Sequence, residues 1–380
     1  MRLEKTQKDQ IKKYADKYNE IAAGLMRDFT ADTKDNVVFS PFSVLMLLSI
    51  VADSVGGETR QQVLDVIGSD LPFEEYRDMI SAMQSIFTDE DTTDGTFISS
   101  NAVCIQEKLK ESITPGYEDR IGQYQGKLFA SAEMVRDVNA WVEEKTKGMI
   151  TNVADESMSS MLACLMNAIA FEADWGKKYE ESDIYEDSFT NADGTESEVQ
   201  MMDSTEQIYI EDEFFTGFVK PYKGRKYSYV ALLPKKKGPS FLKRSLDRIN
   251  ITKLLGNKSR AKVYVSMPEF RYDFGKELTN LFMKMGIQTL FTPQADFSPM
   301  SSAWLKMDSI LHKAHIEVDR KGTKAAAVTM GIVTAGCAPV MEEVKTVTLN
   351  RPFLYAIVHN ETGLPVFEGF MNHAETQKHC

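Results

Sequence analysis

Residues 321–341 read KGTKAAAVTMGIVTAGCAPVM, and the seventeen of them that follow Lys324 carry no charged side chain. A helix is disfavoured here, because β-branched residues recur and Gly331 and Gly336 interrupt the run. A membrane span is also disfavoured, since the run is at the short limit of about 17–25 residues and contains Gly, Thr and Pro. No proline stands between Gly322 and Ala338, so every backbone N–H there is free to join a β-ladder. The pattern therefore predicts extended backbone.

Alternate positions of this stretch differ in size, as they do in a strand with one buried face. Lys324 belongs to the set that should face water, so the other set should face inward. The inward set consists mostly of small residues: Thr323, Ala325, Ala327, Thr329, Gly331, Val333 and Ala335. An ordinary buried strand is the simpler interpretation, but this run is long beside a usual strand of about 5–6 residues. We interpret it as a segment able to slide between two other strands.

The sequence Gly322-Thr323-Lys324-Ala325-Ala326-Ala327, followed downstream by LNRPF at 349–353, resembles the hinge and C-terminal signature of the serpin family. The resemblance runs from about residue 8 to residue 374. It implies an α+β fold in which a large central, mostly antiparallel sheet is accompanied by two further sheets and surrounding helices. It also implies an exposed reactive-centre loop at about 320–345. No Pro-rich or Gly/Ser-rich linker divides the chain, so we expect a single domain over 1–380.

In the family, the hinge is the part of the loop that enters the central sheet. The resemblance assigns it to Gly322, Thr323, Lys324, Ala325, Ala326, Ala327, Val328 and Thr329. It assigns the sites that control opening of the sheet, called the shutter and the breach, to Ser40, Ser43, Asn167, His312 and Trp175. Lys324 and Arg320 depart from the acids common at their positions, and 172–174 (Glu-Ala-Asp) departs from the usual Lys-Gly-Lys.

Local patterns predict the elements around these sites. Apolar residues on one face predict a helix over about 11–29. Ser40 and Pro41 predict the start of a buried helix, and Thr59 is expected to cap another. An amphipathic helix over 137–150, ending at Gly148, resembles the serpin helix that crosses the front of the main sheet. Residues 161–175 read as a strand buried on both faces.

Asn167 is the lone polar residue in the middle of that buried strand. Because an unpaired buried amide costs about 1–3 kcal/mol, Asn167 should have specific hydrogen-bond partners. His312 falls where serpins place a shutter histidine, and it is expected to bond Asn167. His312 and His315 are three apart on the same predicted strand, so they point to opposite faces and make a poor metal pair.

The composition restricts the partners. A net charge of −12 and a pI near 5.1 argue against nucleic acid or an anionic membrane. The basic cluster of Lys235, Lys236, Lys237, Lys243 and Arg244 is explained better by a solvated hairpin loop than by a polyanion site. No metal and no cofactor are expected, and no hydrolase or phosphate-binding motif is present, so we do not expect an enzyme.

Four cysteines in a chain of this length, Cys104, Cys164, Cys337 and Cys380, do not make a disulfide scaffold and lack metal-ligand spacing. We expect Cys337 to be the reactive thiol, since it lies in the loop. The charged N-terminus is not a signal peptide. An extracellular protein is expected if Met1 precedes an already mature chain, and a cytoplasmic one if Met1 is native.

The resemblance implies a monomeric suicide inhibitor that forms a covalent complex with a target serine protease. Counting forward from Gly322, as the family does, places the reactive bond at Gly336–Cys337, and counting back from Pro352 lands near Met341. Nearby alternatives are Val333, Thr334, Ala335 and Ala338. These small, uncharged residues favour an elastase- or subtilisin-like target. The alternatives are inhibition of papain-like cysteine proteases, or a non-inhibitory serpin with a carrier, chaperone or storage role.

Overall fold

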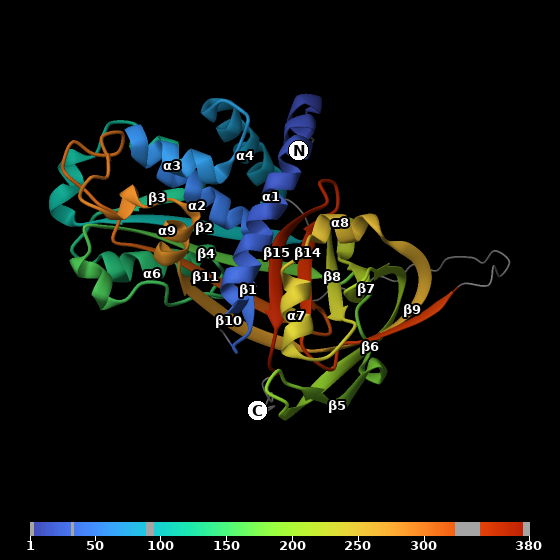
Figure 1. Cartoon of the computed structure of the whole chain (residues 1–380). Coiled ribbons are helices and arrows are strands. Elements are labelled where there is room, and N and C mark those ends of the chain that lie inside the picture. The colour runs from blue at the N-terminus through green and yellow to red at the C-terminus, as the bar shows by residue number, and fades with distance from the viewer. Residues whose placement is uncertain (1–3, 32–33, 89–94, 324–342, 375–380) are drawn as a thin grey trace.

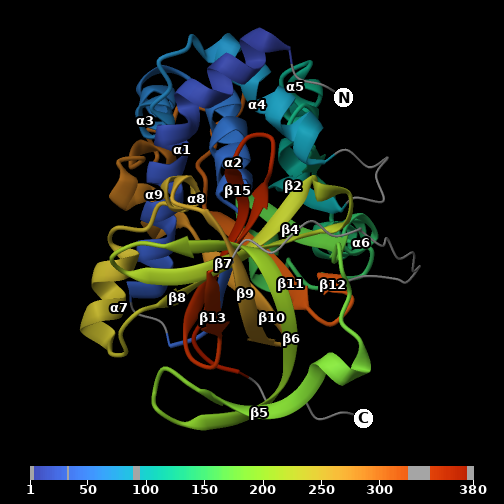
Figure 2. The ribbon, with the colours of Figure 1, turned by 90° about the vertical axis from the view of Figure 1, so that its right-hand side faces the viewer.

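The structure is a computed structural model that describes residues 4–31, 34–88, 95–323 and 343–374. Helices α1 to α5 form a layer on one side of the sheets, and β5 lies at the opposite end of the molecule (Figure 2). The helices are α1 Lys5–Ala31, α2 Pro41–Ser54, α3 Gly57–Ile67, α4 Phe73–Phe87, α5 Tyr117–Gly122, α6 Met134–Lys145, α7 Pro239–Leu246, α8 Ile251–Gly256 and α9 Thr279–Met285.

A mostly antiparallel sheet crosses the helical half of the molecule (Figure 1). Among the described residues it has six strands, in the order β10 Phe270–Glu277, β11 Ser309–Val318, β12 Gly322–Thr323, β4 Ala163–Asp174, β2 Thr96–Ile105 and β3 Gly126–Phe129. The parallel pairs are β2 with β3 and β11 with β4. The sheet and its surrounding helices confirm the predicted α+β class.

The other strands differ in one respect from the prediction of two further sheets. In the described part of the chain they form one continuous nine-stranded sheet, because β6 pairs with β7, with β9 and with β5. The strands are β1 Val37–Phe39, β15 Leu364–Met371, β14 Phe353–His359, β8 Tyr227–Pro234, β7 Phe215–Pro221, β6 Glu196–Glu211, β9 Ser259–Pro268, β13 Val344–Thr348 and β5 Ile184–Thr190. The sixteen residues of β6 are long enough to belong to both halves of this sheet.

Most of the predicted local structure is found. The apolar face of α1 is buried, and the Ser40 hydroxyl caps α2 by accepting the Ser43 N–H at 3.0 Å. The prediction for Thr59 was wrong: α3 begins after Gly56, and the Thr59 hydroxyl accepts the N–H of Asp296 instead. The helix expected over 137–150 is α6, which starts earlier and ends at Lys145, with Gly148 in the left-handed region (φ +77°) just beyond it.

The loop predicted for the basic cluster is found for only part of it. Lys235–Lys237 lie in the connection after β8, as predicted, but Lys243 and Arg244 lie on α7 rather than in a loop. No helix among the described residues is long and apolar enough to cross a membrane. Cys104 and Cys164 are buried free thiols that face each other across β2 and β4.

Glu368 is a carboxyl group buried in the core, and no local sequence pattern predicts its burial. Glu368 of β15 is 2% exposed, and its Oε2 atom has no hydrogen-bond partner among the described residues. Burial raises the pKa of Glu368 from 4.5 to about 8. The side chain is therefore protonated in the folded protein at neutral pH.

Glu368 makes the stability depend on pH. Between about pH 4.5 and 8 the folded chain holds a proton that the unfolded chain has lost, so the contribution of this group to the free energy of unfolding falls as the pH rises. At about 1.4 kcal/mol per pKa unit, the loss is on the order of several kcal/mol by pH 8. Glu368→Gln removes it. The melting temperature of the variant minus that of the wild type should therefore increase from pH 5 to pH 8.

The comparison between variant and wild type isolates this effect, because buried histidines contribute equally to both proteins. Glu198→Gln, at an exposed position of β6, controls for the loss of one potential charge. A difference for Glu368→Gln that does not change with pH would show that Glu368 is not protonated in the folded protein.

Candidate functional site

The start of the hinge already lies between two strands of the six-stranded sheet. Gly322 and Thr323 form β12, which pairs antiparallel with β4 through Ala173 and with β11 through Val318. Further along the sheet, β4 and β11 pair directly and in parallel, from 164–169 to 309–314. The sheet is therefore open at one end, where the hinge begins, and closed at the other.

Thr323 faces the core, as the period-two pattern predicts. Its side chain is completely buried, and its hydroxyl shares a hydrogen bond of 2.6 Å with the Tyr222 hydroxyl. Gly322 needs to be glycine for a steric reason: a Cβ atom there would lie 2.0 Å from the Ala173 carbonyl oxygen. A small residue and a buried threonine thus begin the strand.

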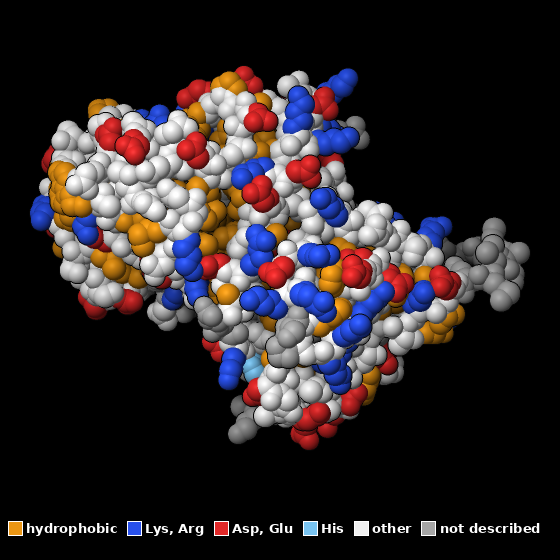
Figure 3. Space-filling view, in the orientation of Figure 1, with side chains coloured by type: hydrophobic (Ala, Val, Ile, Leu, Met, Phe, Trp, Pro, Cys, Tyr) orange, Lys and Arg blue, Asp and Glu red, His pale blue; other side chains and the backbone are white. Residues whose placement is uncertain are grey.

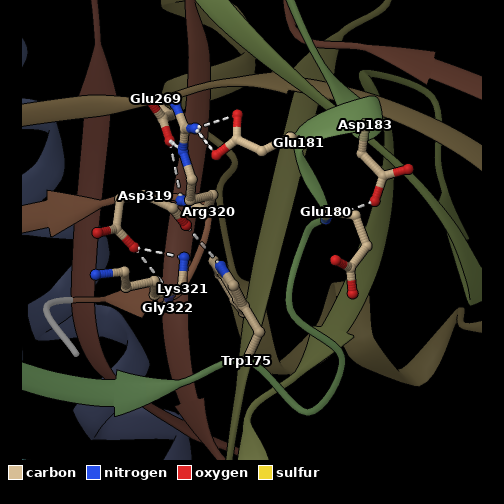
Figure 4. A network of polar contacts seen from close by, with 9 residues as sticks. All are labelled: Trp175, Glu180, Glu181, Asp183, Glu269, Asp319, Arg320, Lys321 and Gly322. Atoms are coloured by element: carbon tan, nitrogen blue, oxygen red, sulfur yellow. Dashed lines mark hydrogen bonds and ion pairs between the residues drawn. The ribbon is translucent and has the colours of Figure 1, made fainter. Parts of the chain in front are cut away.

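Trp175 fixes the open end of the sheet, at the position called the breach. Its indole Nε1–H donates to the Asp319 carbonyl at 2.8 Å, and its backbone N–H donates to the Lys321 carbonyl at 2.9 Å. The indole ring stacks on Tyr222 with centroids 4.6 Å apart and an interplanar angle of 6°. The end of β4 therefore holds the turn that leads from β11 to the hinge (Figure 4).

Arg320 is bound on two sides in the same turn (Figure 4). Its Nε–H donates to Glu269 at 2.9 Å, and its Nη1 donates to both carboxylate oxygens of Glu181 at 2.8 and 3.0 Å. These contacts raise the pKa of Arg320, with the bond to Glu269 as the largest cause. The departure of Arg320 from the family pattern is therefore matched by two acids, and Glu269 is itself buried.

The shutter residues predicted from the resemblance are brought together. Asn167 of β4 is opposite His312 of β11, and the His312 Nδ1–H donates to Asn167 Oδ1 at 2.8 Å. The Asn167 amide donates to Ser99 at 3.2 Å and to Asn101 at 2.9 Å, both on β2. Ser99 Oγ lies 3.3 Å from Ser43 Oγ, which connects the network to α2 and through it to the Ser40 cap.

His312 joins β4 to β11 within the stretch where these two strands pair directly. It is fully buried, and burial alone lowers its pKa to about 3, so the imidazole is neutral. Its Nε2 atom has no partner among the described residues. Opening the sheet here exchanges the bond between His312 and Asn167 for new partners, at a cost of about 1–3 kcal/mol if none are supplied.

Sequence reasoning missed Ser99 and Asn101, which complete the network. The sequence does indicate these residues, because 99–101 is a polar run in a strand whose next four residues are apolar. His315 is a separate case: it faces away from the shutter, and its Nδ1 lies 2.6 Å from Asp273. Within the described chain no group of three or more His, Cys, Asp or Glu side chains is arranged to hold a metal ion.

The remaining predicted site residues lie outside the described residues. These are Lys324, Ala325, Ala326, Ala327, Val328 and Thr329 of the hinge, and Val333, Thr334, Ala335, Gly336, Cys337, Ala338 and Met341 around the reactive bond. The described chain resumes at Glu343 and continues into β13, which pairs in parallel with β9.

The outer face of the sheet is covered by α6, on the side opposite α2 (Figure 1). Val138 and Val142 of α6 pack in one buried cluster with Met166, Ala168 and Ala170 of β4. The face of β4 that points away from the main core is therefore buried beneath α6 in this region.

The comparisons with known proteins agree with this geometry. Residues 16–373 match the family model described as Serpin (serine protease inhibitor). A serpin-like protein of Thermococcus kodakarensis is 28% identical over 353 residues, which cover 90% of this chain and 81% of that protein. Plasminogen activator inhibitor 1 of Bos taurus is 29% identical, with 92% of this chain and 91% of that protein covered.

Solved structures show the same fold. The native-state crystal structure of the thermophilic serpin tengpin has a TM-score of 0.83 and 31% identity, and the match covers 98% of this chain and 95% of that one. Human thyroxine-binding globulin has a TM-score of 0.85 at 22% identity, with 97% and 100% covered. With the family model spanning nearly the whole sequence, the chain belongs to the serpin family.

Proposed function

We propose that this chain inhibits serine proteases as a suicide substrate, by inserting its cleaved loop between β4 and β11. The observation that carries the proposal is the position of β12, which already lies between these strands and pairs antiparallel with both. The next residues of the inward set, Ala325, Ala327 and Thr329, are small or hydroxyl-bearing and can follow Thr323 into the sheet.

The register of β12 supports insertion in a specific way. An inserted strand that kept this register for six more residues would bring Thr329 between Asn167 of β4 and His312 of β11. A hydroxyl can both donate and accept, so Thr329 could replace the hydrogen bond that these two residues lose when the strands part. The polar groups of Asn167 and His312 would then have hydrogen-bond partners both before and after insertion.

The proposed chemistry uses the active site of the target. The protease serine oxygen attacks the carbonyl carbon of the reactive bond, an ester forms, and the C–N bond breaks as the new amine takes a proton. Insertion of the hinge then competes with attack of water on the ester. If insertion is faster, the protease is carried along the sheet while still acylated, and its active site is distorted.

The direct test is a gel assay with elastase or subtilisin. An inhibitor of this type gives a covalent complex that survives SDS, whereas a carrier or storage serpin gives no complex. The same assay with papain tests for a cysteine-protease target. Absence of a stable complex with every one of these proteases would overturn the proposal.

We predict that the reactive bond is Gly336–Cys337. The forward count sets how far the protease is carried, whereas extra residues after the cut are harmless. No Lys or Arg occurs between Lys324 and Lys345, so a trypsin-like pocket has no basic side chain to bind. Mass spectrometry of the peptide released from the complex should show Cys337 at its start. Cleavage before residue 332 or after 341, or inhibition of trypsin but not elastase, would contradict this assignment.

The hinge charge gives a second prediction. An inserted strand that kept the β12 register for one more residue would bring Lys324 opposite Glu172 of β4. The family pattern has the opposite signs at these two positions, so the two departures compensate each other in this chain. Glu172→Lys should slow complex formation a few-fold, because like charges then oppose each other across the strands.

A double-mutant cycle tests that pairing. Glu172→Lys and Lys324→Glu should each slow complex formation when made alone. The double variant, in which both charges are reversed, should recover most of the lost rate. Glu172 also pairs with Lys147 at 3.0 Å, so Lys147→Ala serves as the control for loss of that contact alone. If the double variant is as slow as the two single effects combined, the residues do not meet during insertion.

A further inference from the structure

A large cavity lies away from the shutter and the breach. Its volume is about 930 Å³, and it is lined by the end of α1, the turn between β5 and β6, the end of β8, α7 and the segment before β14. None of its lining residues belongs to β4, β11 or β12. The volume is within the usual range of small-molecule sites.

The cavity is cationic although the whole chain has a net charge of −12. Six basic residues line it, against the two acids Asp193 and Asp247. The basic residues are Arg27, Lys34, Lys236, Lys237, Lys243 and Arg351. Within the described residues none of the six forms an ion pair, whereas Lys235, just outside, is paired with Glu211 at 2.6 Å. Figure 3 shows basic side chains gathered over the surface that carries α7.

Arg351 provides the deepest positive charge. It is half-buried, its Nη2 donates to the Pro234 carbonyl at 2.6 Å, and no other hydrogen bond of its guanidinium is found among the described residues. Burial lowers the pKa of Arg351, and among the described residues its guanidinium forms no ion pair with a carboxylate. Its remaining N–H groups are available to an anion.

The walls of the cavity are largely apolar. Leu242 and Leu246 of α7 and Phe370 of β15 line it together with Pro234 and Pro352. Phe370 and Leu246 are buried, so the apolar part lies at depth, while Lys236, Lys237 and Lys243 are exposed at the rim. This arrangement suits a ligand with a hydrocarbon or aromatic body and an anionic group, rather than a bare inorganic ion.

We propose that this cavity binds a small amphipathic organic anion, with its carboxylate or sulfonate held by Arg351 and the lysines of the rim and its apolar body against α7 and Phe370. Six cations against two acids leave an excess of positive charge in the lining, and a bound anion would offset that excess. The proposal is independent of protease inhibition, because the two sites share no residue.

The test uses the fluorescent probe 8-anilinonaphthalene-1-sulfonate with the intact chain. We expect saturable binding at one site with a micromolar dissociation constant, and displacement of the probe by decanoate. Decanamide, the neutral analogue, and inorganic sulfate, the anion without an apolar body, should compete at least about tenfold more weakly. Equal competition by decanamide would show that the anionic group does not contribute to binding. Equal competition by sulfate would show that the apolar body does not contribute. Either result would overturn the proposal.

Adjacent positions on α7 supply a matched control. Lys243 lines the cavity and Arg244 does not, although both are exposed. Lys243→Glu should weaken probe binding about tenfold or more, and Arg244→Glu should change it less than twofold. Arg351→Gln, checked for folding by its melting temperature, should also weaken it about tenfold. Equal losses for Lys243→Glu and Arg244→Glu, or no saturable binding below millimolar probe, would overturn the proposal.

Discussion

Replacing Thr323 with arginine should convert the proposed inhibitor into a substrate. Thr323 is completely buried between β4 and β11, and its hydroxyl bonds Tyr222. A guanidinium at this position would have no acidic partner in the contacts made by Thr323, and burying it unpaired would cost several kcal/mol. The start of the variant's hinge should therefore leave the sheet before cleavage, and insertion would have to overcome that cost. Because each 1.4 kcal/mol is a factor of ten in rate, deacylation should overtake insertion.

The measurement is the stoichiometry of inhibition, the number of inhibitor molecules consumed for each protease inactivated. Thr323→Arg should raise it by on the order of tenfold or more, with cleaved chain accumulating on gels. Thr323→Val is the matched control, since it keeps the shape and removes only a hydrogen bond worth about 1 kcal/mol. An unchanged yield of covalent complex from Thr323→Arg would exclude insertion past this residue.

The hinge could be interpreted from the sequence because its pattern is local. Period-two alternation follows from strand geometry alone, so the inward orientation of Thr323 could be predicted without a partner strand. The pairing of Asn167 with His312 is non-local. It was predicted from the family resemblance, and from the general cost of leaving a buried amide without a partner.

Other features depend on contacts between distant segments that periodicity does not report. Arg320 is separated by 51 residues from Glu269 and by 139 from Glu181, so nothing local indicated that its charge is paired. Thr59 has the local signature of a cap but bonds Asp296 from another part of the chain. The loop predicted for the whole basic cluster differs from the helix α7 that carries Lys243, and the apolar residues that line a cavity with Lys243, such as Phe370, come from the other end of the sequence.

Cutting the loop should make the protein more stable. Insertion gives up the direct parallel ladder between 164–169 and 309–314 and replaces it with two antiparallel ladders, one on each side of the new strand. About ten additional ladder bonds at about 0.5–1.5 kcal/mol each supply on the order of 10 kcal/mol. For 380 residues, with about 2.1 cal/mol/K of unfolding entropy per residue, the melting temperature should rise by about 10 °C or more.

The cut is best made with a metalloprotease such as thermolysin, which forms no acyl-enzyme and therefore cannot be trapped. Calorimetry before and after cleavage measures the rise, and cleaved Thr323→Arg provides the control, because its hinge is blocked at the first buried position. If the wild type gains stability and the variant does not, the gain comes from insertion and not from release of a strained loop. Equal gains in melting temperature for the wild type and the variant would contradict the register proposed for the hinge. No gain in either protein would favour a non-inhibitory serpin, because a loop that does not stabilise the sheet by entering it has no driving force with which to move a protease.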